Sequence, residues 1–426
     1  MRFTPVLHKH LLGRWYNDMW KQKKRVTVDN RKLKQALEAN GKTVYDAAKL
    51  FGVQWEDREP RVMETAVGAE AALVEPARRP EHHQTAAFVY QGKNLLLGQR
   101  QAQALTNTIQ VGEGLPEQVT ALEGLERIRN QDELVTDVIK TSLMFDATQE
   151  KLSKVIDVTR LGLPQPVQYG VPELRSNRSL LSGLLSLCER LAVRLDGFQS
   201  RLTLYRPLLS ATHVTSDGHR LLVSRRPELA LMADRPLPAP APAQAVEASR
   251  AAAAPQLEPV SPFVHLHSVH DYQWRDVAPV SAGCRHRYVH TLFLAWNGRI
   301  KKWVDDDQLG ALSVMSMHAA AVNMARQQAG PGRPAVVQCV ATDGRLFKRS
   351  VLQLNTQAVP DPTSGEVSTR HQLKNLLWTE PATPLYERCA YTDGRPLLAG
   401  YNAEVFNRLL ALYMNGLLAR TVPDLN

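Results

Sequence analysis

Three stretches of the 426-residue chain space their apolar side chains three or four positions apart, as a helix with one buried face does. In the first stretch, Leu184, Cys188 and Leu191 fall on a single face. Aspartates favour a helix start because they complement its dipole, and an asparagine there can cap free N–H groups. The predicted helices are 180–197, 308–328 after three aspartates, and 402–420 after the capping residue Asn402.

Two other stretches place tight turns between apolar runs. In 336–356, "VVQCVATDGRLFKRSVLQLNT", an Asp-Gly pair begins at 343, and in 288–304 an Asn-Gly pair begins at 297. Such pairs suit β-hairpins because the turn requires positive φ angles and the Asp side chain can bond its own backbone. Asp343 is therefore interpreted as a turn-forming residue rather than a catalytic one.

The alternation of strands and helices in the C-terminal half predicts an α/β to α+β mixed fold. We expect a hairpin-rich sheet with flanking helices, plus an extended basic N-terminal segment. The length exceeds the usual size of one core, and a Pro/Ala-rich stretch with restricted φ angles is typical of a linker. The expected segments are 1–25 (presequence or basic arm), 26–80 (helical and extended), 81–235 (first mixed unit), 236–259 (linker) and 260–426 (second mixed unit).

Much of the formal net charge of +10 lies at the start of the chain. Residues 1–25 hold seven Lys or Arg and one acid, and on a helix Phe3 and Leu7 would lie opposite Arg2 and Lys9. An amphipathic, basic start is typical of a mitochondrial presequence. The alternative is a basic arm whose RNA contacts would be Lys23, Lys24 and Arg25. Because no apolar run approaches the roughly 18 residues of a membrane helix, we expect no membrane insertion.

The motifs of common enzyme classes are missing from the sequence. Gly-Lys-Thr at 41–43 lacks the earlier glycine of a phosphate-binding loop, and neither a serine-hydrolase elbow nor a His-Glu-x-x-His helix occurs. One histidine-rich cluster contains zinc-ligand residue types, but its spacing matches no closed zinc site. We expect no metal, no cofactor and no enzymatic activity, with a matrix metalloenzyme as an alternative. The cluster comprises His265, His267, His270, Asp271, Cys284, His286 and His290.

Basic and aromatic residues interleave in the region that follows the expected linker. Cationic groups neutralise phosphates and aromatic rings stack on unpaired bases, which is how looped or single-stranded RNA is bound. A solvated sheet face would show the same pattern, and an RNA-processing factor is a further alternative function. The candidate RNA contacts are Arg285, Arg287, Lys301, Lys302, Trp303, Arg345, Lys348 and Arg349.

Several short segments resemble one known family. The most specific are "TDGRLF" at 342–347 and "QLNT" at 353–356, which a sister family once named programmed cell death protein 9 shares. "EGLPEQV" at 113–119 and "NQDE" at 130–133 favour the first family over its sister. With "VHTLFL" at 289 and "EVFNRLLALYMNG" at 404, these segments resemble the mitochondrial ribosomal large-subunit protein 37 family from about residue 80 to the end.

This resemblance implies a non-enzymatic protein of the mitochondrial large ribosomal subunit. Such a protein contacts large-subunit rRNA, neighbouring ribosomal proteins and its paralogous sister in the mitochondrial matrix, and supports mitochondrial translation. The resemblance supplies no individual binding residues, so the candidate RNA contacts depend on charge and aromatic interleaving alone.

Overall fold

A computed structural model of the chain contains two compact units, 1–74 and 75–426. In the first unit, the described residues include a helical turn that ends at Gly41 (φ +71°), whose N–H donates to the Glu38 carbonyl at 3.0 Å. The other elements belong to the second unit. The structure describes residues 35, 37–43, 86–144, 150–152, 169–195, 198–214, 220–252, 255, 257, 260–270, 276–281, 283–296, 305–327, 334–357, 372–392 and 395–417.

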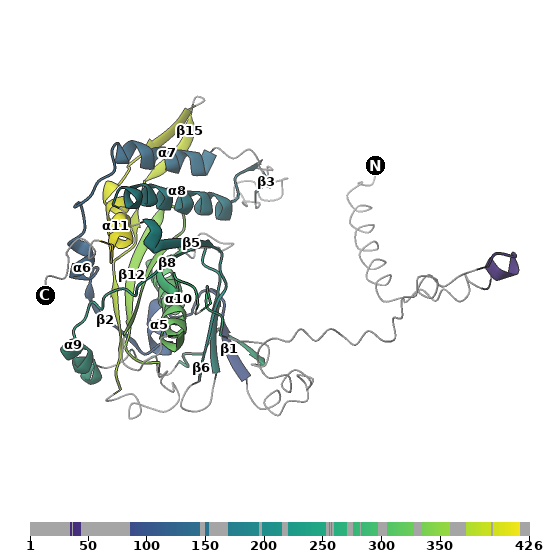
Figure 1. The fold of residues 1–426 in the computed structure, drawn as a ribbon, viewed down its shortest axis with the longest axis horizontal. Helices are drawn as coiled ribbons and strands as arrows, with labels where there is room; N and C mark the ends of the chain where they lie inside the picture. Colours follow the sequence, from purple (N-terminus) through teal and green to yellow (C-terminus); the bar gives the residue numbers. More distant parts are fainter. Residues whose placement is uncertain are drawn as a thin grey trace, which may run out of the picture. The chain divides into compact units, whose positions relative to one another are not determined.

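Within the described part of the second unit, eight strands form one mixed sheet (Figure 1). Its neighbouring strands are antiparallel, except that β10 pairs with β11 and β2 with β13 in parallel. The spatial order is β2 (Thr108–Glu113), β13 (Asn375–Thr379), β12 (Leu346–Leu354), β11 (Ala335–Thr342), β10 (Tyr288–Ala295), β8 (Leu229–Ala233) and β5 (Arg201–Tyr205), with β14 (Thr383–Pro384) beside β12.

Both faces of this sheet are apolar, because alternate residues of the central strands enter different cores. Val337, Cys339 and Ala341 of β11 join the core that contains α10, whereas Val336 and Val340 join the core of α8 and α11. A sheet covered on both faces requires continuous apolar runs. This explains why β11 is buried along its whole length.

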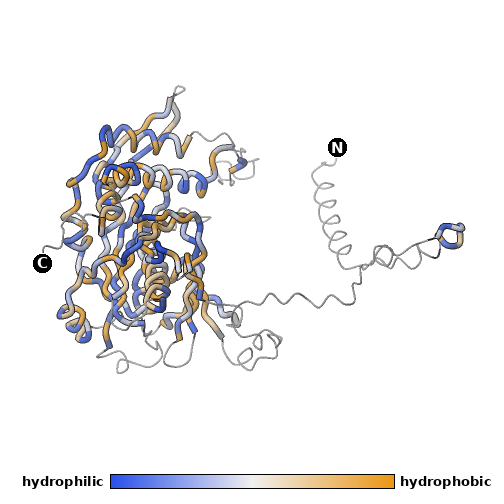
Figure 2. The backbone as a smooth tube through the Cα atoms, in the orientation of Figure 1, coloured by the Kyte–Doolittle hydropathy of each residue, from blue (hydrophilic) through white to orange (hydrophobic). Residues whose placement is uncertain are grey.

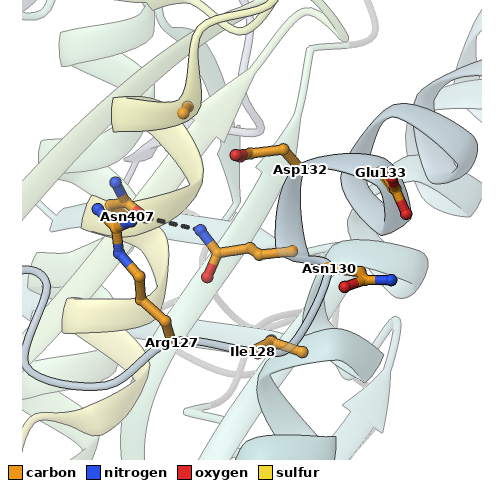
Figure 3. Close-up of a pocket in the computed structure, with 8 residues that line it drawn as sticks. Arg127, Ile128, Asn130, Asp132, Glu133 and Asn407 are labelled. Carbon is orange, nitrogen blue, oxygen red and sulfur yellow. Dashed lines mark hydrogen bonds between the residues drawn. The ribbon is translucent and has the colours of Figure 1, made fainter.

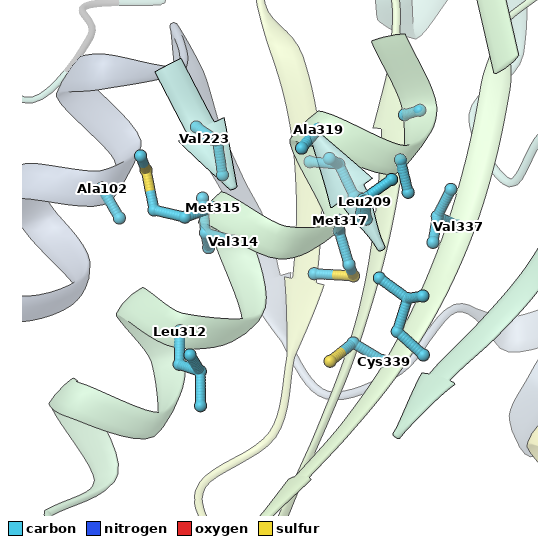
Figure 4. Close-up of a cluster of buried hydrophobic side chains, with 14 of the residues drawn as sticks. Ala102, Leu209, Val223, Leu312, Val314, Met315, Met317, Ala319, Val337 and Cys339 are labelled. Atoms are coloured by element: carbon cyan, nitrogen blue, oxygen red, sulfur yellow. The ribbon is translucent and has the colours of Figure 1, made fainter. Parts of the chain in front are cut away.

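The helix α10 (Asp306–Gln327) connects the parallel strands β10 and β11 and lies between the large sheet and a smaller one. In Figure 4, Met315 of α10 extends toward Ala102 near Val223, whereas Met317 lies on the side of Val337 and Cys339. Since sheets pack on both sides of it, α10 is buried from Leu309 to Met324. The smaller sheet has the order β6 (Leu209–Val214), β7 (Arg220–Arg225), β1 (Ala86–Tyr90) and β9 (His267–His270).

Helices α7 (Gln131–Met144), α8 (Glu173–Arg194) and α11 (Ala403–Met414) contribute to the second core. Hydrophobic and hydrophilic positions alternate along α7 and α8 in Figure 2, as expected of helices with one buried face. None of the helices in the described ranges is long and apolar enough to cross a membrane. The remaining elements are α5 (Gly98–Leu105), α6 (Glu117–Thr120), α9 (Ala243–Ala248), η4 (Phe198–Ser200), η5 (Ser249–Ala251), the pair β3 (Glu150–Lys151) and β4 (Tyr169–Gly170), and the hairpin β15 (Arg388–Thr392) and β16 (Arg395–Ala399).

The mixed fold with hairpins is confirmed, and β11 and β12 form the hairpin predicted around Asp343. The second predicted hairpin lies partly at 297–304, outside the described residues. Its first strand, β10, has both edges occupied by β8 and β11.

The expected division into two mixed units at 236–259 is wrong. Strands from before this segment (β2, β5, β8) and after it (β10 to β13) pair in the same sheet. The segment itself packs on this body, since the Ala241 N–H donates to Gln353 Oε1 at 2.9 Å and the Lys374 N–H donates to Ser249 Oγ at 3.1 Å. The composition of residues 236–259 resembles that of a linker, but these long-range hydrogen bonds hold the segment against the surface of the second unit.

Candidate nucleic-acid interface

Two of the predicted RNA contacts, Arg285 and Arg287, lie exposed just before β10. The Arg287 guanidinium lies over the Tyr288 ring, 5.1 Å from its centroid, and Nη2 donates to Tyr288 Oη at 3.0 Å. Arg285 Nη2 lies 3.9 Å from Asp234 Oδ2, and its side chain remains 66% exposed. Both guanidinium groups therefore keep free donors for an incoming phosphate.

Neighbouring strands bring further groups to this end of the sheet. Exposed Arg235 follows β8, whose Ala233 is paired with Tyr288. Phe198, 49% exposed, precedes Gln199, whose carbonyl oxygen lies 2.8 Å from His286 Nε2. We call Phe198, Arg235, Arg285 and Arg287 the β10-start patch.

Arg345 is exposed in the turn between β11 and β12, at the opposite end of the sheet. Ala295 at the end of β10 is paired with Thr342, whereas Arg287 precedes the start of that strand. With a rise of about 3.3 Å per residue, the length of β10 separates the two sites by about 23 Å. The structure therefore does not bring Arg345 together with the β10-start patch.

Asp343 organises the turn that carries Arg345. Its Oδ1 accepts the N–H groups of Arg345 at 2.9 Å and Leu346 at 2.7 Å. Gly344 has φ +98°, and a Cβ at this position would clash with Asn177. The interpretation of Asp343 as a turn-forming residue is confirmed.

Lys348 and Arg349 were expected to contact RNA, and the structure corrects both expectations. Lys348 is 2% exposed and its Nζ donates to both Asp306 carboxylate oxygens at 2.8 Å. Arg349 is 1% exposed and its Nε donates to Glu380 Oε2 at 2.8 Å, while burial lowers the pKa of its guanidinium. Because both cations are buried and each is bound to a carboxylate, neither is free to reach a phosphate.

The other candidates lie outside the described residues. They are Lys23, Lys24, Arg25, Lys301, Lys302 and Trp303.

The structure reveals a second basic cluster near Arg345 that the sequence reasoning missed. Glu228, at the start of β8, accepts Arg178 Nε at 2.8 Å and lies 3.9 Å from Arg206 Nε. Exposed Arg226 is two residues before it. We call Arg178, Arg206, Arg226 and Arg345 the β10-end patch. Each of these arginines comes from a different element, so only the "LYRP" and "SRRPE" segments were local signals.

The described side chains of the histidine-rich cluster have different partners, and Asp271 lies outside the described residues. His290 is 1% exposed, with Nε2 2.9 Å from the Asn415 carbonyl and Nδ1 2.8 Å from Thr291 Oγ1. Burial, followed by the nearby Arg201, lowers the pKa of this imidazole well below 6.5. His267 instead lies against Lys93. Among the residues that the structure describes, no three His, Cys, Asp or Glu side chains are placed to hold a metal ion.

A polar cavity of about 350 Å³ lies where the start of α7 meets α11 (Figure 3). Gln131 Nε2 donates to Asn407 Oδ1 at 2.7 Å, and Tyr401 Oη donates to Asp132 Oδ1 at 3.1 Å. Of the described residues, those that line the cavity include no Ser, Thr, Cys or His. Its lining thus offers no hydroxyl or thiol nucleophile of the Ser, Thr or Cys type and no histidine base.

Comparison with known proteins shows relatives that match most of the chain. The "Large ribosomal subunit protein mL37" of Bos taurus is 28% identical over 343 residues, which cover 77% of this chain and 74% of that protein. The chain is similar to mL37 proteins along most of its length. The mL37 proteins of Rattus norvegicus and Mus musculus are 28% and 27% identical and cover 79% and 80% of this chain.

A family model described as "Mitochondrial 28S ribosomal protein S30 (PDCD9)" matches residues 307–416, from α10 to α11. This description and the name of mL37 refer to different ribosomal subunits, and the mL37 proteins match the larger part of the chain. Together these matches confirm the resemblance and indicate a mitochondrial protein. The family match includes Arg345, whereas Arg285 and Arg287 precede it.

Proposed function

We propose that the chain is a structural, non-enzymatic component of the mitochondrial large ribosomal subunit. The observation that carries this proposal is its similarity to mL37 proteins along 77% to 80% of its length. The role of its polar groups supports it: Asp343 forms a turn, and the Arg349–Glu380 pair joins β12 to the segment after β13.

We further propose that the chain contacts large-subunit rRNA through separate arginines rather than through one continuous groove. Arg285, Arg287 and Arg345 are exposed on two ends of the sheet, and guanidinium groups bind phosphates through bidentate hydrogen bonds. Phosphate contacts position a protein on RNA without reading its sequence. The further proposed contacts are Lys23, Lys24, Arg25, Lys301, Lys302 and Trp303.

Other large-subunit proteins, including the paralogous sister protein, are the proposed partners of the remaining surface. The segment 1–25 accounts for a large share of the net charge of +10, and the rest of the chain is only moderately basic. A protein threaded through rRNA would need many more cations to neutralise the phosphates around it. We therefore place the chain at the periphery of the subunit, where it supports mitochondrial translation as a scaffold.

Affinity purification tests this proposal. A C-terminally tagged chain is recovered from mitochondrial lysate, and its bound proteins and RNA are identified by mass spectrometry and sequencing. We expect large-subunit proteins and large-subunit rRNA in amounts comparable with the bait. Recovery of the chain with mitochondrial transcripts alone would instead favour an RNA-processing factor, and recovery without either would reject both functions.

A further inference from the structure

The β10-end patch borders an exposed aromatic ring. Tyr205, the last residue of β5, is 64% exposed, and its Oη lies 3.3 Å from Ser182 Oγ on α8. The next residue of the chain is Arg206, with a side chain that is 53% exposed. A ring anchored at its hydroxyl end and open to solvent is a surface on which a planar group can stack.

Polar contacts along α8 hold this ring and the cations in a fixed relation. Thr203 Oγ1 donates to Glu189 Oε1 at 2.8 Å, and Tyr205 meets Ser182 two residues farther along β5. Arg178 lies four residues before Ser182 and therefore on the same face of the helix. Its Nε donates to Glu228, so one buried carboxylate orients the guanidinium beside the ring.

The backbone at Arg206 adopts an unusual conformation. Its φ of +47° is rare for a residue other than glycine, and the following Pro207 further disfavours such a helical region. The Arg206 N–H donates to the Glu228 carbonyl at 3.1 Å, which holds the chain in this turn. Strained backbone that the surroundings maintain is concentrated at functional sites. Here it places an arginine directly after an exposed tyrosine.

We propose that Tyr205, Arg206 and Arg178 form a binding site for an unpaired nucleotide of RNA. The base stacks on the Tyr205 ring, and the two guanidinium groups hold the adjoining phosphates, while Arg226 and Arg345 add positive charge at the same end of the sheet. This proposal rests on the proposed function. It specifies the kind of RNA element, a loop or bulge, that the chain would contact there.

The chemistry of the site favours unpaired RNA over a duplex. Bases in an A-form helix are stacked on one another and expose only their edges, so their faces cannot reach a protein ring. Stacking also tolerates any base, because every base has a π-face. Glu228 is 6% exposed and already binds Arg178, and Asp343 accepts two N–H groups of its own turn. The four arginines of the patch outnumber these two carboxylates, so the surface charge remains positive.

Fluorescence anisotropy tests the site, with the full chain and a fluorescein-labelled 12-nucleotide single-stranded RNA of mixed sequence. Tyr205→Ala should weaken binding about tenfold, because one stacked base is lost. Tyr205→Phe keeps the ring and should stay within about threefold of the wild type. Tyr169→Ala is the matched control, since Tyr169 is also exposed (66%) but lies on β4. Circular dichroism verifies that each variant is folded.

The salt dependence of RNA binding tests the arginines of the site separately. Arg206→Ala should lower the slope of log affinity against log salt by about 0.7, the value for one contact with a single strand. Wild-type affinity in Tyr205→Ala, or no RNA binding by the wild type, would overturn the site. The chain would still sediment with the large subunit in that case, so failure of the site is distinguishable from failure of the proposed function.

Discussion

Arg349 and Glu380 form an ion pair inside the fold, with Nε 2.8 Å from Oε2 and side chains that are 1% and 7% exposed. Thr383 accepts a second hydrogen bond from Arg349 at 2.7 Å, and Arg408 approaches Glu380 at 3.4 Å. The pair joins β12 to the segment that follows β13. It shows that a strongly basic stretch of sequence can serve packing instead of RNA contact.

Removal of one partner of this pair should destabilise the protein strongly. Glu380→Ala leaves the Arg349 charge buried without its carboxylate, which costs about 3–5 kcal/mol of unfolding free energy. Urea unfolding followed by circular dichroism measures this loss. The double variant Arg349→Met/Glu380→Leu removes both charges and should recover most of it. A loss below about 1 kcal/mol in Glu380→Ala would contradict the buried pair.

Three buried histidines should make stability depend on pH. Burial lowers the pKa of His213 from 6.5 to about 3, and those of His290 and His318 well below 6.5. Below pH 6.5 the unfolded chain binds protons that the folded chain excludes. Each histidine therefore lowers the unfolding free energy by about 1.4 kcal/mol for each unit by which the pH falls below 6.5. Above pH 6.5 the histidines are neutral in both states and no longer reduce the stability.

Urea unfolding at pH 8.0, 6.5 and 5.5 measures this slope. The His213 and His318 rings lie 4.6 Å apart, so His213→Phe/His318→Phe removes two of the three contributions at one place. That variant should retain about a third of the histidine-dependent slope. An equal slope in the variant and the wild type would show that these rings are protonated in the folded state.

The β10-start patch should contribute to the salt dependence of RNA binding. Arg285→Glu/Arg287→Glu removes two possible phosphate contacts, so the slope of log affinity against log salt should fall by about 0.7 for each. Anisotropy titrations between low and physiological salt measure it. The control Arg100→Glu/Arg129→Glu makes the same change of charge at two other exposed arginines. Equal effects of the two variants would mean that only overall charge matters.

The Asp343 turn should affect stability but not binding. Asp343→Ala loses both hydrogen bonds to the backbone and should lower the unfolding free energy by about 1–2 kcal/mol. Asp343→Asn keeps an acceptor oxygen and should lose less than half of that. If Asp343→Ala abolished binding to the ribosomal subunit while the unfolding free energy stayed unchanged, a direct functional role would replace the structural one.

Features that depend only on residues close together in the chain could be predicted from the sequence. The Asp-Gly pair at 343 predicts the β11–β12 hairpin because the turn forms within itself. Asn402 accepts the Glu404 N–H at 3.0 Å and begins α11, as its position predicts. Such local bonds can be recognised from one chain alone.

Features that depend on distant residues could not be predicted in the same way. Lys348 and Arg349 pair with carboxylates that are 42 and 31 residues away, so nothing in their own segment distinguishes them from exposed cations. The pairing of β10 with β8, which comes from before the Pro/Ala-rich segment, is likewise non-local. The β10-end patch is assembled from α8, the residues beside β5 and β8, and the β11–β12 turn, and no single stretch of sequence contains it.

Sucrose-gradient sedimentation of mitochondrial lysate, probed for this chain at low and high salt, tests its place in the large ribosomal subunit most directly. The chain should migrate with the large-subunit rRNA at low salt. At high salt it should remain there if protein contacts dominate and be released if phosphate contacts dominate. A chain found only in the free-protein fractions at both salt concentrations would contradict its assignment to the ribosome.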